Sequence, residues 1–214
     1  MRNSKMRYSL IAAAIALTGC MTQVGAADDM TAKSDAAATA AVIKGSFAEK
    51  GQAKLDRLNQ SEEQKFCSEA GLTGKMDPAR KAELEKAALA AVKYPADGKY
   101  LGDWKNGMKL ASKGRGLQFS DKPGSQVFGN CYACHQLDTA EISFGNMGPS
   151  LNNYGKLRGT SEEIMKYTWA RIWNSHAFNA CNAMPRFGAA GLLTETEIKD
   201  VMALLLDPAS PVNK

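Results

Sequence analysis

Residues 129–136, "GNCYACHQ", restrict the possible fold and chemistry of this chain more than any other stretch. Cys131 and Cys134 lie three residues apart, and His135 follows directly. A C-x-x-C pair alone is compatible with a redox-active dithiol, half of a zinc site or a disulfide. The dithiol enzymes need a βαβ context that is missing here, and zinc needs a second Cys or His pair at matching spacing. With the histidine, the pattern is typical of covalent haem attachment.

The motif predicts a role for each of its three reactive residues. The two cysteines add to the vinyl groups of the haem, and the two residues between them keep both sulfurs on one helical turn. The histidine then lies under the iron as its proximal ligand. We therefore expect one haem c, bound covalently by Cys131 and Cys134 and ligated by His135.

The sixth position of the iron has several candidate ligands. They are Met184, His176 and, less favoured, Met147 or Met165. Met184 lies in "NAMPRFG", where Pro185 stiffens a loop that is kept out of a helix by its Asn and Gly neighbours. A methionine is more often core filler, and His176 is as easily a hydrogen-bonded residue at a helix end. We favour Met184, because a thioether raises the haem potential and suits an electron acceptor.

The stretch "GNMGPSL" is expected to orient the proximal histidine. A ligating histidine usually donates its remaining ring N–H to a backbone carbonyl, which fixes the ring plane. Pro149 has no N–H of its own and would place such a carbonyl rigidly. Without the haem motif, an ordinary Gly-Pro turn would be the preferred interpretation.

The N-terminus predicts export. Three basic residues precede an apolar run that is too short to cross a bilayer but suits the core of a signal peptide. Two processing sites compete, one before Ala27 after the small residues "VGA", and one at a lipoprotein box that ends at Cys20. We assign residues 1–26 to a signal peptide and expect a periplasmic protein. Membrane attachment is expected only if Cys20 carries a lipid.

The overall charge gives no support for nucleic-acid binding. The formal net charge is +5 at pH 7, and removal of the signal peptide leaves 24 basic against 22 acidic residues. Such a weak excess of cations does not predict a phosphate-binding surface. The hydrophobic content of 44% is enough for a real core.

The five cysteines divide into three groups. Cys20 lies in the signal region and two more form the haem motif, which leaves Cys67 and Cys181. An exported protein rarely leaves two thiols idle, so we predict a Cys67–Cys181 disulfide. The alternative is two unpaired cysteines, with Cys181 available for sulfur chemistry.

The periodicity predicts an all-α fold, a cytochrome c-like haem domain with an N-terminal helical extension. Residues 27–93 form the extension, with a break near "GLTGKMDP" and with Asp77 and Pro78 starting its last helix. Residues 94–214 form the haem domain, beginning with a connector in which only 104–112 is a helix candidate. No strand of comparable clarity appears.

Two further helices are predicted after the motif. The first is indicated by "TSEEIMKYTWARIWN", with Thr160 and Glu163 as a capping box. The second is indicated by "TETEIKDVMALLLDP", with Thr194 and Glu197 as a capping box. We expect the segment entering the motif to be a helix that crosses the last helix, with Gly124 and Phe128 at the contact.

Four stretches together resemble SoxX, the family of small monohaem cytochrome subunits of periplasmic SoxAX complexes in bacterial thiosulfate oxidation. They are "GNCYACHQ", "GNMGPSLNNYGKLRG", "CNAMPRFG" and "LTETEIKDVMALLLDPASPVN", and the likeness covers roughly residues 94–214. The C-x-x-C-H and M-P-x-F patterns are shared by many small cytochromes c. Their combination with "CNAMPRFG" and the "LLLDPASPVN" ending is more specific.

The resemblance implies a heterodimer with a larger haem-bearing SoxA-type subunit. That partner would carry the catalysis, an L-cysteine S-thiosulfotransferase reaction that joins thiosulfate to a cysteine of a carrier protein. This chain would accept the electrons through a haem with His135 and Met184 as axial ligands and pass them to a small soluble cytochrome c.

Two other functions stay open at the level of sequence. The first is a free-standing periplasmic cytochrome c electron carrier, which the residues alone do not separate from a subunit. The second is a haem enzyme such as a peroxidase, which Met184 disfavours because such an enzyme needs an open sixth position. For any of these electron-transfer roles we expect a partner-facing surface around Met184, Arg186 and Phe187.

Overall fold

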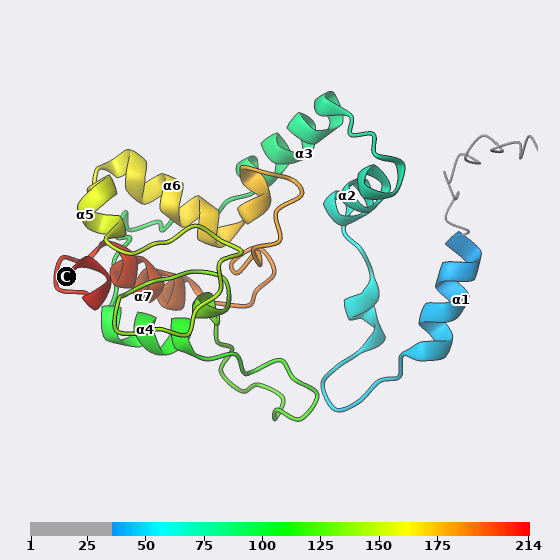
Figure 1. The fold of residues 1–214 in the computed structure, drawn as a ribbon, viewed down its shortest axis with the longest axis horizontal. Helices are drawn as coiled ribbons and strands as arrows, with labels where there is room; N and C mark the ends of the chain where they lie inside the picture. The colour runs from blue at the N-terminus through cyan, green and yellow to red at the C-terminus, as the bar shows by residue number, and fades with distance from the viewer. Residues whose placement is uncertain (1–35) are drawn as a thin grey trace, which may run out of the picture.

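The computed structural model describes residues 36–214, and Figure 1 shows this segment as helices joined by long loops. Within the described residues there is no strand, and the one sheet-like pairing is an isolated bridge between Lys50 and Ala53. The predicted all-α class is therefore confirmed. The α-helices are α1 (Ala36–Ser46), α2 (Glu62–Thr73), α3 (Pro78–Ala90), α4 (Trp104–Ser112), α5 (Tyr154–Arg158), α6 (Glu162–Trp173) and α7 (Glu195–Leu206). Short 3-10 turns are η1 (Leu55–Leu58), η2 (Cys131–Ala133), η3 (Ser175–Ala177) and η4 (Pro211–Asn213).

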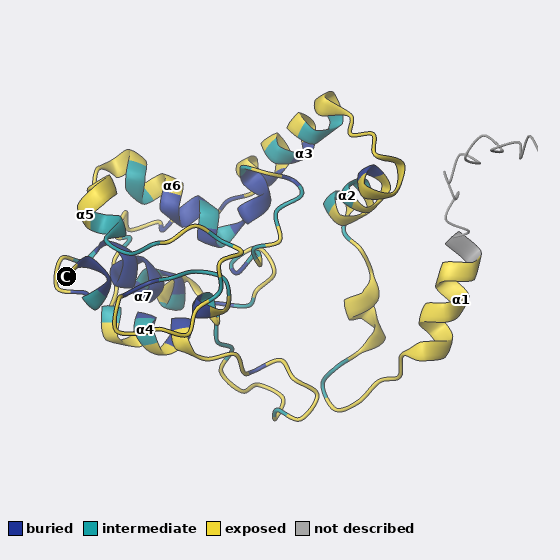
Figure 2. Ribbon diagram, in the orientation of Figure 1, coloured by how far each residue is buried: buried dark blue, intermediate teal, exposed yellow. Residues whose placement is uncertain are grey.

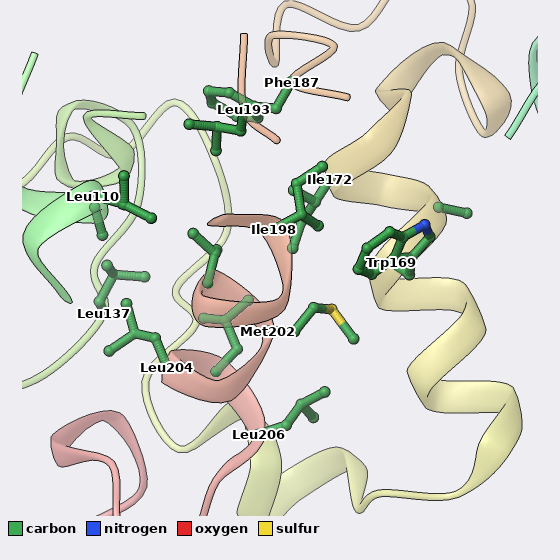
Figure 3. Packing of buried hydrophobic residues seen from close by; sticks show 14 of the residues in the cluster. Leu110, Leu137, Trp169, Ile172, Phe187, Leu193, Ile198, Met202, Leu204 and Leu206 are labelled. Carbon is green, nitrogen blue, oxygen red and sulfur yellow. The ribbon is translucent and has the colours of Figure 1, made fainter. Parts of the chain in front are cut away.

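The centre of the core is α7, whose last two turns are buried on every side. In Figure 3, Leu110 of α4 and Trp169 of α6 approach α7 from opposite sides, with Met202 between them. Both side chains are almost fully buried, and each large apolar side chain removed from water contributes roughly 1.5–3 kcal/mol. The core of residues 94–214 is thus built on the α4, α6 and α7 contacts, and the buried sides of these helices are visible in Figure 2.

The helix that crosses α7 differs from the one predicted. Residues 122–130 before the motif are irregular, and α4 from the presumed connector makes the crossing. The glycine at the contact is Gly107, where a Cβ atom would lie 2.1 Å from the carbonyl oxygen of Asp200. Gly124 instead has nothing within 4 Å and a φ of +78°, so it serves a turn. The expectation for Gly124 was wrong because the close approach occurs on another element.

The helix starts follow local capping chemistry. Asp77 accepts hydrogen bonds from the backbone of Ala79 and Arg80 at 2.9 and 3.3 Å, as predicted for the start of α3. Thr194 and Glu197 form the predicted reciprocal capping box at α7. At α6 the cap is Ser161 instead of Thr160, since the Ser161 hydroxyl accepts from the backbone N–H of Ile164.

The extension consists of α1, α2 and α3, and only part of it packs on the haem domain. In Figure 2, α1 is exposed throughout its described length, whereas α3 has a buried side. The Glu85 carboxylate on α3 accepts a hydrogen bond from the backbone N–H of Ala180 at 3.0 Å. Trp169 of α6 donates its indole N–H to the carbonyl of Lys93 at 2.8 Å, which fixes the chain as it leaves α3.

The segment between α1 and α2 lies along the loop after α4. Gln52 donates its side-chain amide to the carbonyls of Gly116 and Gln118 at 3.1 and 2.8 Å. Arg57 donates to the carbonyl of Leu117 at 2.7 Å. The extension therefore contacts residues 94–214 at this loop, at α6 through Lys93, and at the loop near Ala180.

Among the described residues, no helix has both the length and the apolar character needed to cross a membrane. The predicted signal peptide, with Cys20 and Ala27, lies outside the described residues.

Candidate functional site

The two cysteines of the motif lie on a single tight turn. Residues 131–133 form η2, and the backbone N–H groups of Cys134 and His135 both donate to the carbonyl of Cys131, at 3.1 and 2.9 Å. Asn130 enters the turn in the left-handed region with a φ of 47°, a conformation that Asn tolerates better than most residues. Both thiols are free and half-buried. The turn therefore presents two sulfurs close together without joining them.

The protonation of Cys131 argues against a redox-active dithiol. Burial raises the pKa of the Cys131 thiol to about 12, so the protein on its own holds it as a neutral thiol. Catalytic dithiols instead have a lowered thiol pKa, because the thiolate is the nucleophile. No group of three or more His, Cys, Asp or Glu residues that could hold a metal ion occurs in the described part of the chain. Covalent attachment to a haem requires neither a lowered thiol pKa nor a cluster of metal-binding side chains.

His135 is held by the loop that follows it. Its Nδ1 lies 2.7 Å from the carbonyl oxygen of Pro149, the contact expected from the sequence. Because a carbonyl oxygen can only accept, Nδ1 must carry the proton. The lone pair of Nε2 is then free to bind a metal ion, and the ring orientation is fixed by a backbone group.

Two glycines let residues 145–148 lie directly against the motif. A Cβ atom at Gly148 would lie 2.2 Å from Cε1 of His135, and one at Gly145 would lie 1.9 Å from the carbonyl oxygen of Ala133. The backbone N–H of Gly148 donates to the carbonyl of Cys134, and that of Gly145 donates to the carbonyl of Tyr132, both at 2.8 Å. Sequence reasoning selected Pro149 but missed these glycines, although the "GNMG" spacing next to the proline was a readable signal.

Tyr132, inside the motif, forms a buried pair that was also missed. Its hydroxyl donates to Oδ2 of Asp138 at 2.8 Å, and Oδ1 of Asp138 accepts from the backbone of Ala140 and Glu141. Burial, followed by the Asp138 contact, raises the pKa of Tyr132. Leu137, between the motif and Asp138, is buried in the main core (Figure 3). These contacts anchor the motif to the core through Tyr132, Leu137 and Asp138.

The Met184 loop is fixed by short polar contacts. The hydroxyl of the buried Ser175 donates to the carbonyl of Met184 at 2.6 Å, and the Met184 N–H donates to Oδ1 of Asn182 at 2.8 Å. The Met184 side chain is half-buried against the core. Met184 therefore lies in a loop that is fixed by hydrogen bonds. Met165 differs, because it packs against the core from helix α6.

The Met184 loop and the haem motif meet at Gly129. A Cβ atom at Gly129 would lie 3.3 Å from Sγ of Cys131 and 3.5 Å from Cε1 of Phe187. Phe187 follows Met184 by three residues, so the segment just after Met184 reaches the motif. Phe187 itself is buried and belongs to the core cluster. Phe187 is therefore not itself exposed, and the partner-facing surface around Met184 and Arg186 stays a prediction.

His176, the rival ligand, is buried and neutral. Its Nε2 lies 3.2 Å from the carbonyl of Asn182, so this nitrogen carries the proton and donates. Burial, reinforced by the Arg186 cation, lowers the pKa of His176. Its Nδ1 is buried without a hydrogen-bond partner. Met147, the remaining candidate, is 76% exposed two residues before Pro149.

The predicted disulfide between Cys67 and Cys181 is present, with its two Cα atoms 5.5 Å apart. It joins α2 of the extension to the loop three residues before Met184. The alternative of two unpaired cysteines at 67 and 181 is therefore not what the structure shows.

Comparison with known proteins supports the haem interpretation. Residues 122–207 match the family model of cytochrome c. The chain contains a cytochrome c domain. This domain includes the motif, the 145–149 loop, the Met184 loop and α7. It implies covalently bound haem c, and the residues present fit that group, with two free thiols on one turn and an oriented imidazole.

One relative is described as an uncharacterised lipoprotein from Aquifex aeolicus (strain VF5). It is 45% identical over 135 residues, which is 62% of this chain. The matched region spans 63% of the relative's own length, which is less than two thirds.

Proposed function

We propose that the chain is a monohaem c-type cytochrome that transfers electrons outside the cytoplasm. Cys131 and Cys134 would bind one haem covalently, and His135 and Met184 would be its axial ligands. The observation that carries this proposal is the 2.7 Å contact between His135 Nδ1 and the Pro149 carbonyl. It leaves Nε2 free for iron on the residue that follows two unpaired thiols.

The chain's own residues would keep the ligand geometry the same in both oxidation states. A bound haem supplies a one-electron redox centre. Pro149 would hold the imidazole plane, and Ser175 and Asn182 would hold the Met184 loop. Fixed ligands on both sides reduce the rearrangement that accompanies electron transfer.

We further propose that this cytochrome is the electron-accepting subunit of a SoxAX-type complex. The resemblance in "CNAMPRFG" and the C-terminal stretch supports this role, as does an extension larger than a minimal cytochrome needs. Catalysis, the coupling of thiosulfate to a carrier-protein cysteine, would reside on a larger SoxA-type subunit. A small soluble cytochrome c would take the electrons onward.

The alternative is a free-standing cytochrome c electron carrier. The packing of α3 and α2 on this chain's own loops favours it, because these helices do not need a partner subunit to bury their contact side.

The experiment that separates the two is purification of the natively expressed protein from periplasm and membranes under mild conditions. A SoxAX subunit co-purifies with a larger haem-bearing chain in a fixed ratio, and the mixture oxidises thiosulfate when a carrier protein is added. Isolation as a lone monomeric haem protein would contradict the subunit role and support the free carrier.

The location of the protein is also a proposal. Export to the periplasm follows from the signal-peptide pattern, because haem c attachment to exported proteins takes place there. The lipoprotein description of the relative supports lipid attachment at Cys20 over cleavage before Ala27. Such an anchor would hold the cytochrome at a membrane surface.

A further inference from the structure

One side of α2 contacts the Met184 loop at two points. Cys67 is bonded to Cys181, and Glu63 lies 3.8 Å from Nη1 of Arg186. Glu63 and Cys67 are four residues apart on α2, so they lie on the same face of the helix. Cys181 and Arg186 stand on the two sides of Met184, three residues before it and two after it.

The Glu63–Arg186 ion pair is partly buried, so solvent screens its attraction less than that of an exposed pair. The side chains of Arg186 and Glu63 are only 28% and 18% exposed, whereas those of the Lys65–Glu62 pair on α2 are 61% and 66% exposed. Burial opposes ionisation of Glu63, but backbone and Ser61 hydrogen bonds, together with Arg186, outweigh it and lower its pKa. Glu63 is therefore a carboxylate at neutral pH, and the attraction to Arg186 is present.

Apart from α2, the loop is held by the cytochrome c domain and, at Ala180 just before Cys181, by Glu85 of α3. Ser175 and Asn182 contact the Met184 backbone from within the cytochrome c domain. The α2 contacts hold the loop at two further points, at Cys181 before Met184 and at Arg186 after it. Opening the loop would then require α2 to move as well, and a coupled movement of this kind is less frequent than local opening of a free loop.

We propose that α2 is a clamp that keeps Met184 in position, with Glu63, Cys67, Cys181 and Arg186 as its positioning residues. The inference deepens the proposed function, because it rests on Met184 as the axial ligand. It gives the N-terminal extension a task within this chain. It also assigns Arg186 to an internal contact with Glu63, where the sequence had suggested a partner-facing residue.

The test measures how readily an external ligand replaces Met184. Imidazole is titrated into the ferric holoprotein at pH 7, while the methionine-to-iron charge-transfer band is followed. The apparent affinity for imidazole rises with the fraction of molecules whose loop is open. This readout differs from global stability, which any structural contact would change.

Three variants and one control are compared with the unchanged protein. The variants are the pair Cys67→Ser with Cys181→Ser, the single change Glu63→Gln, and the single change Arg186→Gln. The matched control is Glu62→Gln, which neighbours Glu63 but pairs with Lys65 on the exposed side of α2. If the cysteine pair does not yield folded protein, the two single changes still decide the question.

We expect the cysteine pair to bind imidazole about tenfold more tightly, and Glu63→Gln and Arg186→Gln about threefold, in line with a shielded ion pair. Glu62→Gln should match the unchanged protein. A charge-transfer band in the unchanged protein with no change in any variant would overturn the clamp alone. Absence of that band in the unchanged protein would overturn Met184 ligation and the clamp together.

Discussion

Single side chains decide the geometry around His135. The Pro149 carbonyl fixes the imidazole tautomer, and Gly148 leaves room for the ring where any larger residue would enter it. Met184 and His176 lie in one stretch of chain, yet their surroundings differ. His176 donates through Nε2 to the Asn182 carbonyl while its Nδ1 is buried without a hydrogen-bond partner, whereas the Met184 backbone is held by Asn182 and Ser175.

Replacement of Met184 by Ala should leave the haem attached and abolish the charge-transfer band. The thioether bonds to Cys131 and Cys134 do not depend on the sixth ligand, and loss of a thioether ligand lowers the reduction potential. The control is His176→Gln, whose amide can still donate to Asn182. It should change neither the band nor the potential, as measured by optical spectroscopy and redox titration. Survival of the band in the Met184 variant would refute the assignment.

Replacement of Gly148 by Ala should destabilise the haem domain by about 1–3 kcal/mol, the usual cost of forcing an extra methyl group into a packed site. The new Cβ would meet the His135 ring at 2.2 Å, so the ring or the loop must shift. Denaturant unfolding of the holoprotein measures the free energy. The matched control is Gly71→Ala in α2, where nothing lies within 4 Å and helix propensity improves. Equal stability of the two variants would contradict this account.

Helix α7 is the element on which the domain depends, and its start is set by a capping box. Glu197 accepts hydrogen bonds from the backbone N–H and the hydroxyl of Thr194. Its position in the first turn also places a negative charge near the positive end of the helix dipole. Burial alone would raise the Glu197 pKa, but the Thr194 and Gln126 hydrogen bonds outweigh it and lower the pKa.

Replacement of Glu197 by Gln should cost about 0.3–1 kcal/mol at pH 7, and the difference should shrink as the solution becomes acidic. The native pKa lies below that of the unfolded chain, about 4.3, so the stabilisation is full above that value. It is lost as the pH falls through the native pKa. Unfolding free energies of both proteins at pH 7 and pH 4 test this. A difference that grows on acidification would have the wrong sign.

The elements also show what the sequence can and cannot predict. The capping boxes, the α3 start and the helical character of α6 and α7 are local, and most of them were predictable from neighbouring residues. The crossing of α4 on α7 was not, because the segment around this short helix is dense in Gly, Pro and Lys and resembles a connector until its packing partner is known. Gly107, Gly145 and Gly148 matter only through atoms that are distant in the sequence. The same holds for the contact between Glu63 and Arg186.

The chain as a whole combines a cytochrome c domain with an extension that contacts it at several places. The exposed α1 precedes these contacts in the chain (Figure 1). The disulfide closes a loop of 114 residues across the extension and the domain. In the chain-entropy account a loop of this size contributes about 4–5 kcal/mol.

Replacement of Cys20 by Ala should move the haem protein from the membrane fraction to the soluble periplasm if Cys20 carries the lipid. The anchor is removed, while the cytochrome c domain is unchanged. Immunoblotting and the haem absorbance of both fractions measure the distribution. A protein that is already soluble with Cys20 intact would favour cleavage before Ala27.

The central claim is that the turn at 131–135 carries a covalent haem, and the most direct test is the intact mass of the natively exported protein under denaturing conditions. The account predicts the mature chain plus one haem, with the haem retained on the peptide that contains Cys131 and Cys134. A mass equal to the polypeptide alone, with both thiols open to alkylation, would contradict it.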